Sequence, residues 1–224
     1  MTSLVCALAL SFVLALPFPA AQDSAALTAS SRESPPPASL AKPIAQTLAR
    51  QGVRVLVGTA STALDFWWVA ALPLKAGAAA PSWSGIEEGT LVGAVSIPSD
   101  FRDIRGRVIK PGVYTLRYGL QPANGDHLGV SPYRDFLLLS PASADTDAAA
   151  RGHDGTIDIS KLSVGGSHPA VWSLDPPVAT QPALQAHQTE LGHDAIIMEV
   201  AVTQEGKPSG TLRFGLVLIG RIDA

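Results

Sequence analysis

The clearest pattern of hydrophobic and polar positions in this chain is a strict alternation over Gly112–Leu120. Side chains of a β-strand point alternately to its two faces, so a period of two with one apolar face predicts a half-buried strand. The preceding Lys110-Pro111-Gly112 has the proline and glycine that are typical of a turn. One face carries Tyr114, Leu116, Tyr118 and Leu120, and the other carries Val113, Thr115, Arg117 and Gly119.

Further strands are predicted on both sides of this segment. Val53, Val55 and Val57 alternate with other residues, whereas 63–72 is apolar on both faces, as in a strand that is covered on both sides. The other predicted extended segments are 90–97, 134–140, 156–159 and 167–174, with one helical turn at 160–166 and connections at 73–89, 99–110, 121–132, 141–155 and 175–192.

The last two apolar segments predict a β-hairpin. Its turn is 204–208, and a register centred near Gly206 places Glu199 opposite Arg213. Many short strands with turn signals at this spacing are typical of an all-β fold, and we expect a β-sandwich of about eight or nine short strands. The inward positions of the hairpin are Ile196, Met198, Val200 and Val202 on one strand and Leu212, Phe214, Leu216 and Leu218 on the other.

The N-terminal region predicts export. Residues 4–16 form an apolar run that is too short to span a bilayer and ends at Pro17. This indicates a signal peptide over 1–21, or up to 26 if cleavage follows Ala26. The n-region has no Lys or Arg, and the alternative is an uncleaved membrane anchor.

The residues after this run predict a tether and then a short helix. Residues 22–37 are small, polar and proline-rich, which is typical of a flexible tether. A short N-terminal helix is expected over 38–51, starting near Pro43 and using Ile44 and Leu48 to pack on the domain. Residues 52–224 then form the β-sandwich domain.

Composition excludes several classes of function. The 224 residues carry a formal net charge of −3 without a basic stripe, so nucleic-acid binding is not expected. The single cysteine, Cys6, lies inside the apolar run, so the mature chain has no disulfide and no cysteine nucleophile or ligand. No transmembrane span is expected after signal cleavage, and the protein is predicted to be periplasmic or secreted.

The segment Lys110-Pro111-Gly112-Val113-Tyr114-Thr115-Leu116 resembles a strand motif of secreted bacterial β-sandwich families. Transthyretin-like and carboxypeptidase-regulatory-like domains are similar, as are secreted bacterial families of unknown function. The resemblance covers roughly residues 90–140, with weaker support at 193–220. It implies a sandwich and supplies no catalytic residues, and fold alone does not give a function.

The candidate ligand-binding residues lie in loops near Gly112–Leu120, because loops at one end of a sandwich commonly bind ligands. Histidine, carboxylate and arginine side chains could hold a polar ligand or a divalent metal. The alternatives are a loop fixed by Arg–Asp pairing and a solvated, charge-protected edge. The candidates are Asp126, His127, Tyr133, Arg134 and Asp135, with Arg102 and Asp103 from the alternating charges at 100–107.

Four tryptophans are candidates for stacking on a sugar ring. Trp67 and Trp68 are adjacent on a predicted strand and therefore point to opposite faces, so one of them could be exposed. Trp83 lies in a predicted loop, and Trp172 lies in an extended segment. The alternative for each is burial in the core.

No strong catalytic or metal-binding signature is present. Ser39-Leu40-Ala41-Lys42 matches one motif of penicillin-binding proteins without its partners, and 165–168 lacks the closing glycine of a nucleophile elbow. Residues around Asp154 and Asp158 lack the acids of an EF-hand at both ends of the loop. We therefore expect no catalytic residue, no metal ligand and no cofactor.

The sequence as a whole predicts an exported, non-catalytic domain with a binding or scaffold role at the cell envelope. Its partner would be an envelope polysaccharide or protein, and its ligand is not specified. The alternatives are a secreted hydrolase or a metal-dependent module that uses histidines and aspartates of the loops. The hydrolase requires a pocket with a histidine hydrogen-bonded to a carboxylate.

Overall fold

A computed structural model describes most of the chain. The candidate residues Asp126 and His127, the apolar run 4–16 and both cleavage positions lie outside the described residues, so the signal peptide stays a prediction. No helix among the described residues is long and apolar enough to cross a membrane. The described residues are 27–58, 62–122, 133–176 and 181–220.

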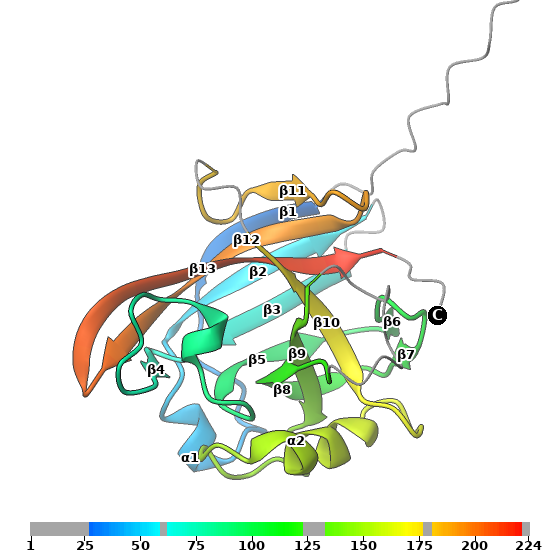
Figure 1. Ribbon diagram of the computed structural model, residues 1–224. Helices are drawn as coiled ribbons and strands as arrows, with labels where there is room; N and C mark the ends of the chain where they lie inside the picture. The colour runs from blue at the N-terminus through cyan, green and yellow to red at the C-terminus, as the bar shows by residue number, and fades with distance from the viewer. Residues whose placement is uncertain (1–26, 59–61, 123–132, 177–180, 221–224) are drawn as a thin grey trace, which may run out of the picture.

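The fold is all-β, as predicted, with two short α-helices and one 3-10 turn in the described residues (Figure 1). The helices are α1 (Lys42–Ala45) and α2 (Gly152–Lys161), and the 3-10 turn is η1 (Trp83–Gly85). The strands are β1 (Leu27–Glu33), β2 (Gln51–Val57), β3 (Thr62–Trp68), β4 (Leu72–Leu74), β5 (Leu91–Ile97), β6 (Phe101–Arg102), β7 (Val108–Ile109), β8 (Gly112–Leu120), β9 (Asp135–Pro141), β10 (Ala170–Asp175), β11 (Ala186–Gln188), β12 (Asp194–Gln204) and β13 (Lys207–Ile219).

Most strands belong to one curled sheet with the order β1-β2-β3-β5-β8-β9-β10-β13-β12-β11, and β4 pairs beside it with β12. β6 and β7 form a separate two-stranded sheet. The curl brings residues of β1 within 8 Å (Cα to Cα) of residues of β11 and β12, at the opposite end of the order. Helix α2 lies across β8 and β9 on the outside of the curl (Figure 1). A sandwich of eight or nine strands is not confirmed by this arrangement.

Strand β8 has the predicted bounds, but the expectation of a half-buried strand is wrong. Tyr114, Leu116 and Tyr118 join the main core, as the alternation predicts. Thr115 and Arg117 on the other face are also fully buried, because the segment 141–151 covers them. A polar face can be buried when each polar atom finds a partner, and the pattern alone does not reveal that cover.

The C-terminal hairpin is confirmed. In the pairing of β12 with β13, Met198 lies opposite Phe214 and Glu199 lies opposite Arg213. Glu199 and Arg213 form an ion pair on the wetter face. Its turn contains Gly206, which has φ 76° and thus the left-handed conformation that glycine adopts easily.

Part of the predicted tether is ordered, which corrects the expectation for 22–37. β1 occupies Leu27–Glu33 and pairs antiparallel with β2 along its whole length. Only Leu27 is buried, and the other side chains are polar or small. An edge strand gains backbone hydrogen bonds without needing apolar side chains, so its composition resembles that of a linker.

The structure places α1 within the predicted helical segment 38–51, although this helix is only four residues long. Pro43 lies in its first turn, and Ile44 and Leu48 are buried against the core. A second correction concerns 156–159, predicted as a strand and found inside α2. The Thr156 hydroxyl donates to Gly152 O within the helix, and the buried Ser160 hydroxyl donates to Ala170 O of β10, a tertiary contact that opposes the local β propensity.

The tryptophans belong to the core, so the idea of an exposed stacking surface at Trp67 or Trp68 is wrong. Trp67 and Trp68 are both buried, and Trp67 Nε1 donates to Ser34 O at 2.9 Å. Trp83 is partly buried and stacks on Tyr118 with ring centroids 5.1 Å apart. Trp172 is fully buried.

The long connection at 175–192 contains β11, an element that the sequence did not predict. β11 pairs antiparallel with β12 over three residues, and His187 lies opposite Ala195. Three residues are too few for an alternating pattern to be recognised, which explains the omission.

Candidate functional site

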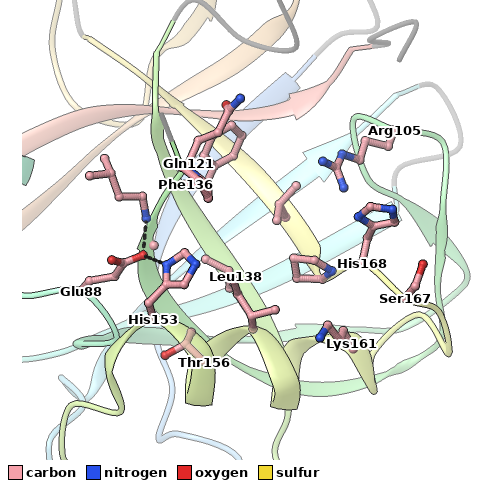
Figure 2. Close-up of a pocket in the computed structure, with 16 residues that line it drawn as sticks. Glu88, Arg105, Gln121, Phe136, Leu138, His153, Thr156, Lys161, Ser167 and His168 are labelled. Carbon is pink, nitrogen blue, oxygen red and sulfur yellow. Dashed lines mark hydrogen bonds and ion pairs between the residues drawn. The ribbon is translucent and has the colours of Figure 1, made fainter. Parts of the chain in front are cut away.

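A pocket of about 280 Å³ lies between α2 and the outer face of β8, β9 and β10 (Figure 2). Its floor belongs to a second apolar cluster, separate from the main core, which includes Phe136, Leu138 and Val171. Gly119 keeps room for this floor, because a Cβ there would lie 2.1 Å from Leu138 Cδ1. The other lining residues are Glu88, Arg105, Leu120, Gln121, Pro122, His153, Thr156, Ile157, Lys161, Ser167, His168 and Pro169.

One end of the pocket holds a histidine–carboxylate pair. His153 Nδ1, on the first turn of α2, lies 2.5 Å from Glu88 Oε1. The same oxygen accepts the backbone N–H of Leu120 at 2.9 Å. A carboxylate in this position selects the tautomer with the proton on Nδ1, which leaves Nε2 as an acceptor on the pocket side (Figure 2).

Two glycines bring the partners of this pair together. Gly89 follows Glu88, Gly152 precedes His153, and both have positive φ, 83° and 67°. A Cβ on Gly89 would lie 2.4 Å from the backbone nitrogen of Gly152, so the two chain segments touch at a point where only glycine fits. The contact sets the distance between the carboxylate and the imidazole.

The buried side chain of Arg117 also links the segment at Gly89 with the segment that precedes α2. The side chain of Arg117 has no exposed surface, and its Nη1 donates to Gly89 O and to Ala149 O at 2.8 Å each. Its Nε and Nη2 donate to the two carboxylate oxygens of Asp145 at 2.6 and 2.9 Å. Burial raises the pKa of Asp145, but the bonds from Arg117 and Thr115 and the nearby positive charges outweigh it and hold the pKa below its usual value.

The opposite end of the pocket carries basic side chains. Arg105, Lys161 and His168 line it, from the loop between β6 and β7, the end of α2 and the segment before β10 (Figure 2). Asp103 lies beside Arg105, and its Oδ1 accepts the backbone N–H groups of Arg105 and Arg107 at 3.0 and 2.9 Å. Burial raises the pKa of Asp103, although these two bonds and the neighbouring arginines lower it.

None of the described candidate residues from the sequence lines this pocket. Arg134 donates to Gln121 O, and Asp135 accepts the Tyr118 hydroxyl at 2.6 Å, so both side chains have local hydrogen-bond partners. Burial, and then that bond, raises the pKa of Tyr118 far above its usual value, so its hydroxyl is a donor. Tyr133 lies next to Arg134, where it is partly buried.

Arg102 and Asp103 line a different hollow of about 610 Å³ with Leu218 and Gly220. Arg102 is exposed and donates to Gly106 O at 2.7 Å. The described candidates therefore lie in two groups, one at the start of β9 and one at the end of β6 and the residue after it.

Sequence reasoning missed Glu88 and did not assign His153 and Arg105 to one pocket. The sequence does contain one relevant feature, which is that Glu88 and His153 each stand next to a glycine. Adjacent glycines permit a close approach of two chain segments, but they do not show which two segments meet.

A second histidine–carboxylate pair lies elsewhere. His187 Nε2 is 3.3 Å from Asp175 Oδ2, and both side chains are about nine-tenths buried. Burial raises the pKa of Asp175, and the bond from His187 opposes that effect. Among the described residues, no three His, Cys, Asp or Glu side chains gather in a way that could hold a metal ion.

Comparisons with protein-family models, with curated proteins and with solved structures find no match to this chain. The geometry of the pocket is therefore the basis for a functional argument.

Proposed function

We propose that this protein is an exported binding protein for a small molecule with an apolar body, and that the ligand occupies the pocket beneath α2. The observation that carries the proposal is the pocket floor of Phe136, Leu138 and Val171 on the outer face of the sheet. Small-molecule sites are commonly concave and mostly apolar with a few placed polar groups. Its volume of about 280 Å³ suits a small ligand.

Export rests on the apolar run at 4–16 and the small residues after it, and a location in the periplasm or outside the cell follows from export. A scaffold role with an envelope polysaccharide or protein stays a prediction of the sequence. The resemblance of 110–116 to secreted bacterial β-sandwich families also stays a prediction.

We also infer that the curled sheet packs as two facing layers, in the manner of a sandwich. Support comes from aromatic contacts between distant strands of the sheet order. Phe66 of β3 lies with its ring centroid 5.7 Å from that of Trp172 of β10, and Trp68 lies 5.5 Å from Phe214 of β13.

Binding is tested by filling the pocket. Ile157 lines the pocket and is only partly buried, so Ile157→Trp covers the floor without overfilling the core. Ile159→Trp, two positions along the same helix and outside the pocket lining, is the matched control. We expect Ile157→Trp to weaken binding of the neutral probe octanamide more than tenfold in calorimetry, and Ile159→Trp to leave it within about twofold. Equal binding by both variants would refute this site.

A hydrolase is the second candidate function, and the Glu88–His153 pair favours it. Nε2 of His153 faces the pocket, where it could take a proton from a water molecule that attacks an ester or amide carbonyl. A serine nucleophile beside His153 is not found among the pocket-lining residues. Thr156 donates to Gly152 O, and Ser167 lies at the opposite end.

The hydrolase is tested with a chromogenic ester such as p-nitrophenyl butyrate. A catalytic His153 predicts that His153→Asn reduces turnover at least a hundredfold. His187→Asn, in the pair away from the pocket, is the control and should retain full turnover. No turnover by the unmodified protein, together with octanamide binding, would leave the binding function alone.

A further inference from the structure

The two ends of the pocket differ in charge. Glu88 and His153 lie at one end and Arg105 and His168 at the other, with apolar side chains between them (Figure 2). A ligand that spans the pocket therefore meets a hydrogen-bonded acid–base pair at one end and the guanidinium of Arg105 at the other.

The lysine and arginine side chains at and beside this end of the pocket differ in whether they already have an ion-pair or hydrogen-bond partner. Lys161 Nζ pairs with Asp158 at 2.9 Å, and Arg107 donates to His168 O at 3.4 Å. Arg105 has no ion pair with a described carboxylate within 4 Å, and its buried Nε has no hydrogen-bond partner among the described residues. Buried polar groups in folded proteins nearly always have partners, so an exception is informative.

The environment of Arg105 makes its positive charge costly. Burial, and then the charge of Arg107, lowers the pKa of its guanidinium, while Asp103 opposes this. The group still stays charged at neutral pH, because an arginine starts from a very high pKa. Asp103 offers little direct compensation, since its Oδ1 is used by backbone N–H groups.

We propose that the ligand carries an anionic group, a carboxylate or a phosphate, that Arg105 binds, with the apolar body over Phe136, Leu138 and Val171. A guanidinium presents a planar fork of N–H donors that matches either group. This inference rests on the proposed binding function and names the class of ligand for the same pocket.

The test uses three probes that share an eight-carbon chain: octanoate, octyl phosphate and the neutral octanamide. Each is titrated calorimetrically into the unmodified protein and into Arg105→Gln. Arg50→Gln removes the same charge from an exposed arginine that lines none of the hollows described above, and it serves as the matched control.

We expect the unmodified protein to bind at least one anionic probe ten times more tightly than octanamide. Arg105→Gln should weaken that anion at least tenfold and leave octanamide within about twofold, and Arg50→Gln should change neither. Preference for octanoate or for octyl phosphate then identifies the anion.

Equal affinity for all three probes, unchanged in Arg105→Gln, would overturn the role of Arg105 while the apolar pocket stands. Loss of all three probes in Arg105→Gln, with a lowered melting temperature, would also overturn it, since it would mean a structural role. Absence of binding by every probe to the unmodified protein would refute the binding function itself.

Discussion

Two arginine–aspartate combinations in this protein use the same chemical groups in opposite ways. Arg117 and Asp145 are fully buried, and Nε, Nη1 and Nη2 of Arg117 donate to Asp145 and to backbone oxygens. Asp103 is also buried and Arg105 is partly buried, yet Arg105 Nε and Asp103 Oδ2 lack hydrogen-bond partners among the described residues. In the first combination, Asp145 belongs to the segment 141–151 that covers Arg117. In the second, Arg105 lines the pocket and Asp103 lines the neighbouring hollow.

This difference distinguishes a charged side chain with a structural role from one that binds a ligand. The criterion is whether its hydrogen-bond donors have partners within the protein. A buried network with every donor satisfied fixes one arrangement of the chain, here the contact between Gly89 and Gly152. A partly buried charge with an unused donor costs free energy that this donor does not recover within the fold. Four predictions test this contrast.

The largest effect is expected for Arg117→Met. Removal of one partner from a buried ion pair costs about 3–5 kcal/mol of stability, because Asp145 would keep only Arg151, at 3.0 Å, as a charged partner. The free energy of unfolding from urea titration measures this loss, and Arg50→Met, at an exposed site, should change it by less than about 0.5 kcal/mol. A loss below about 1 kcal/mol would show that the network does not hold the segment.

The second prediction concerns acid pH. Because the pKa of Asp145 is lower in the folded protein than in the unfolded chain, its stabilisation is complete above the unfolded value, about pH 4. The stabilisation is lost as pH falls through the folded pKa. Urea titrations between pH 5 and pH 2 should therefore show a loss that is reduced in the double variant Arg117→Met, Asp145→Leu. Identical pH dependence of the two proteins would contradict the assignment to Asp145.

The third prediction concerns Asp103, whose pKa is raised. A raised pKa means that the stabilising form is the protonated one, so stability is present below the unfolded value of about pH 4 and is lost as pH rises through the folded pKa. At pH 7, Asp103→Asn keeps an oxygen for the N–H groups of Arg105 and Arg107 and removes the buried charge.

We expect Asp103→Asn to match or exceed the unmodified protein in stability at pH 7, by up to about 1 kcal/mol, and the gain to shrink toward pH 3. Urea titrations at the two pH values measure it. A clear destabilisation at pH 7 would instead show that the Asp103 charge is needed, and the contrast with Asp145 would fail.

Periodicity predicted the strands in which alternating apolar side chains mark the face that is buried. β8 and the β12–β13 hairpin follow from alternating apolar residues and from the turn at Gly206, because these signals are local. β1 was missed because its stability comes from backbone pairing with β2. α2 was missed over 156–159 because its position depends on a distant contact, the hydrogen bond from the Ser160 hydroxyl to Ala170 O of β10.

The pocket could not be predicted because its residues are distant in the chain. Glu88 and His153 are 65 positions apart, and their contact depends on two glycines and on the partners of Arg117. The alternating charges at 100–107 did point to Arg102 and Asp103, next to Arg105. A charge pattern, however, does not show which arginine has its donors satisfied.

The smallest stability effect is expected for Arg105→Met, and it completes the comparison with Arg117→Met. The Nε of the guanidinium that this substitution removes has no hydrogen-bond partner among the described residues, and the group has no ion pair with a described carboxylate. The methionine keeps an apolar side chain against the pocket wall. The free energy of unfolding should change by less than about 0.5 kcal/mol, in either direction. A loss close to that of Arg117→Met would mean that Arg105 is a second structural arginine. A near-zero change combined with lost binding of octanoate or octyl phosphate is the result that a ligand-binding arginine requires, because only a group whose partner is outside the fold can matter for binding and not for stability.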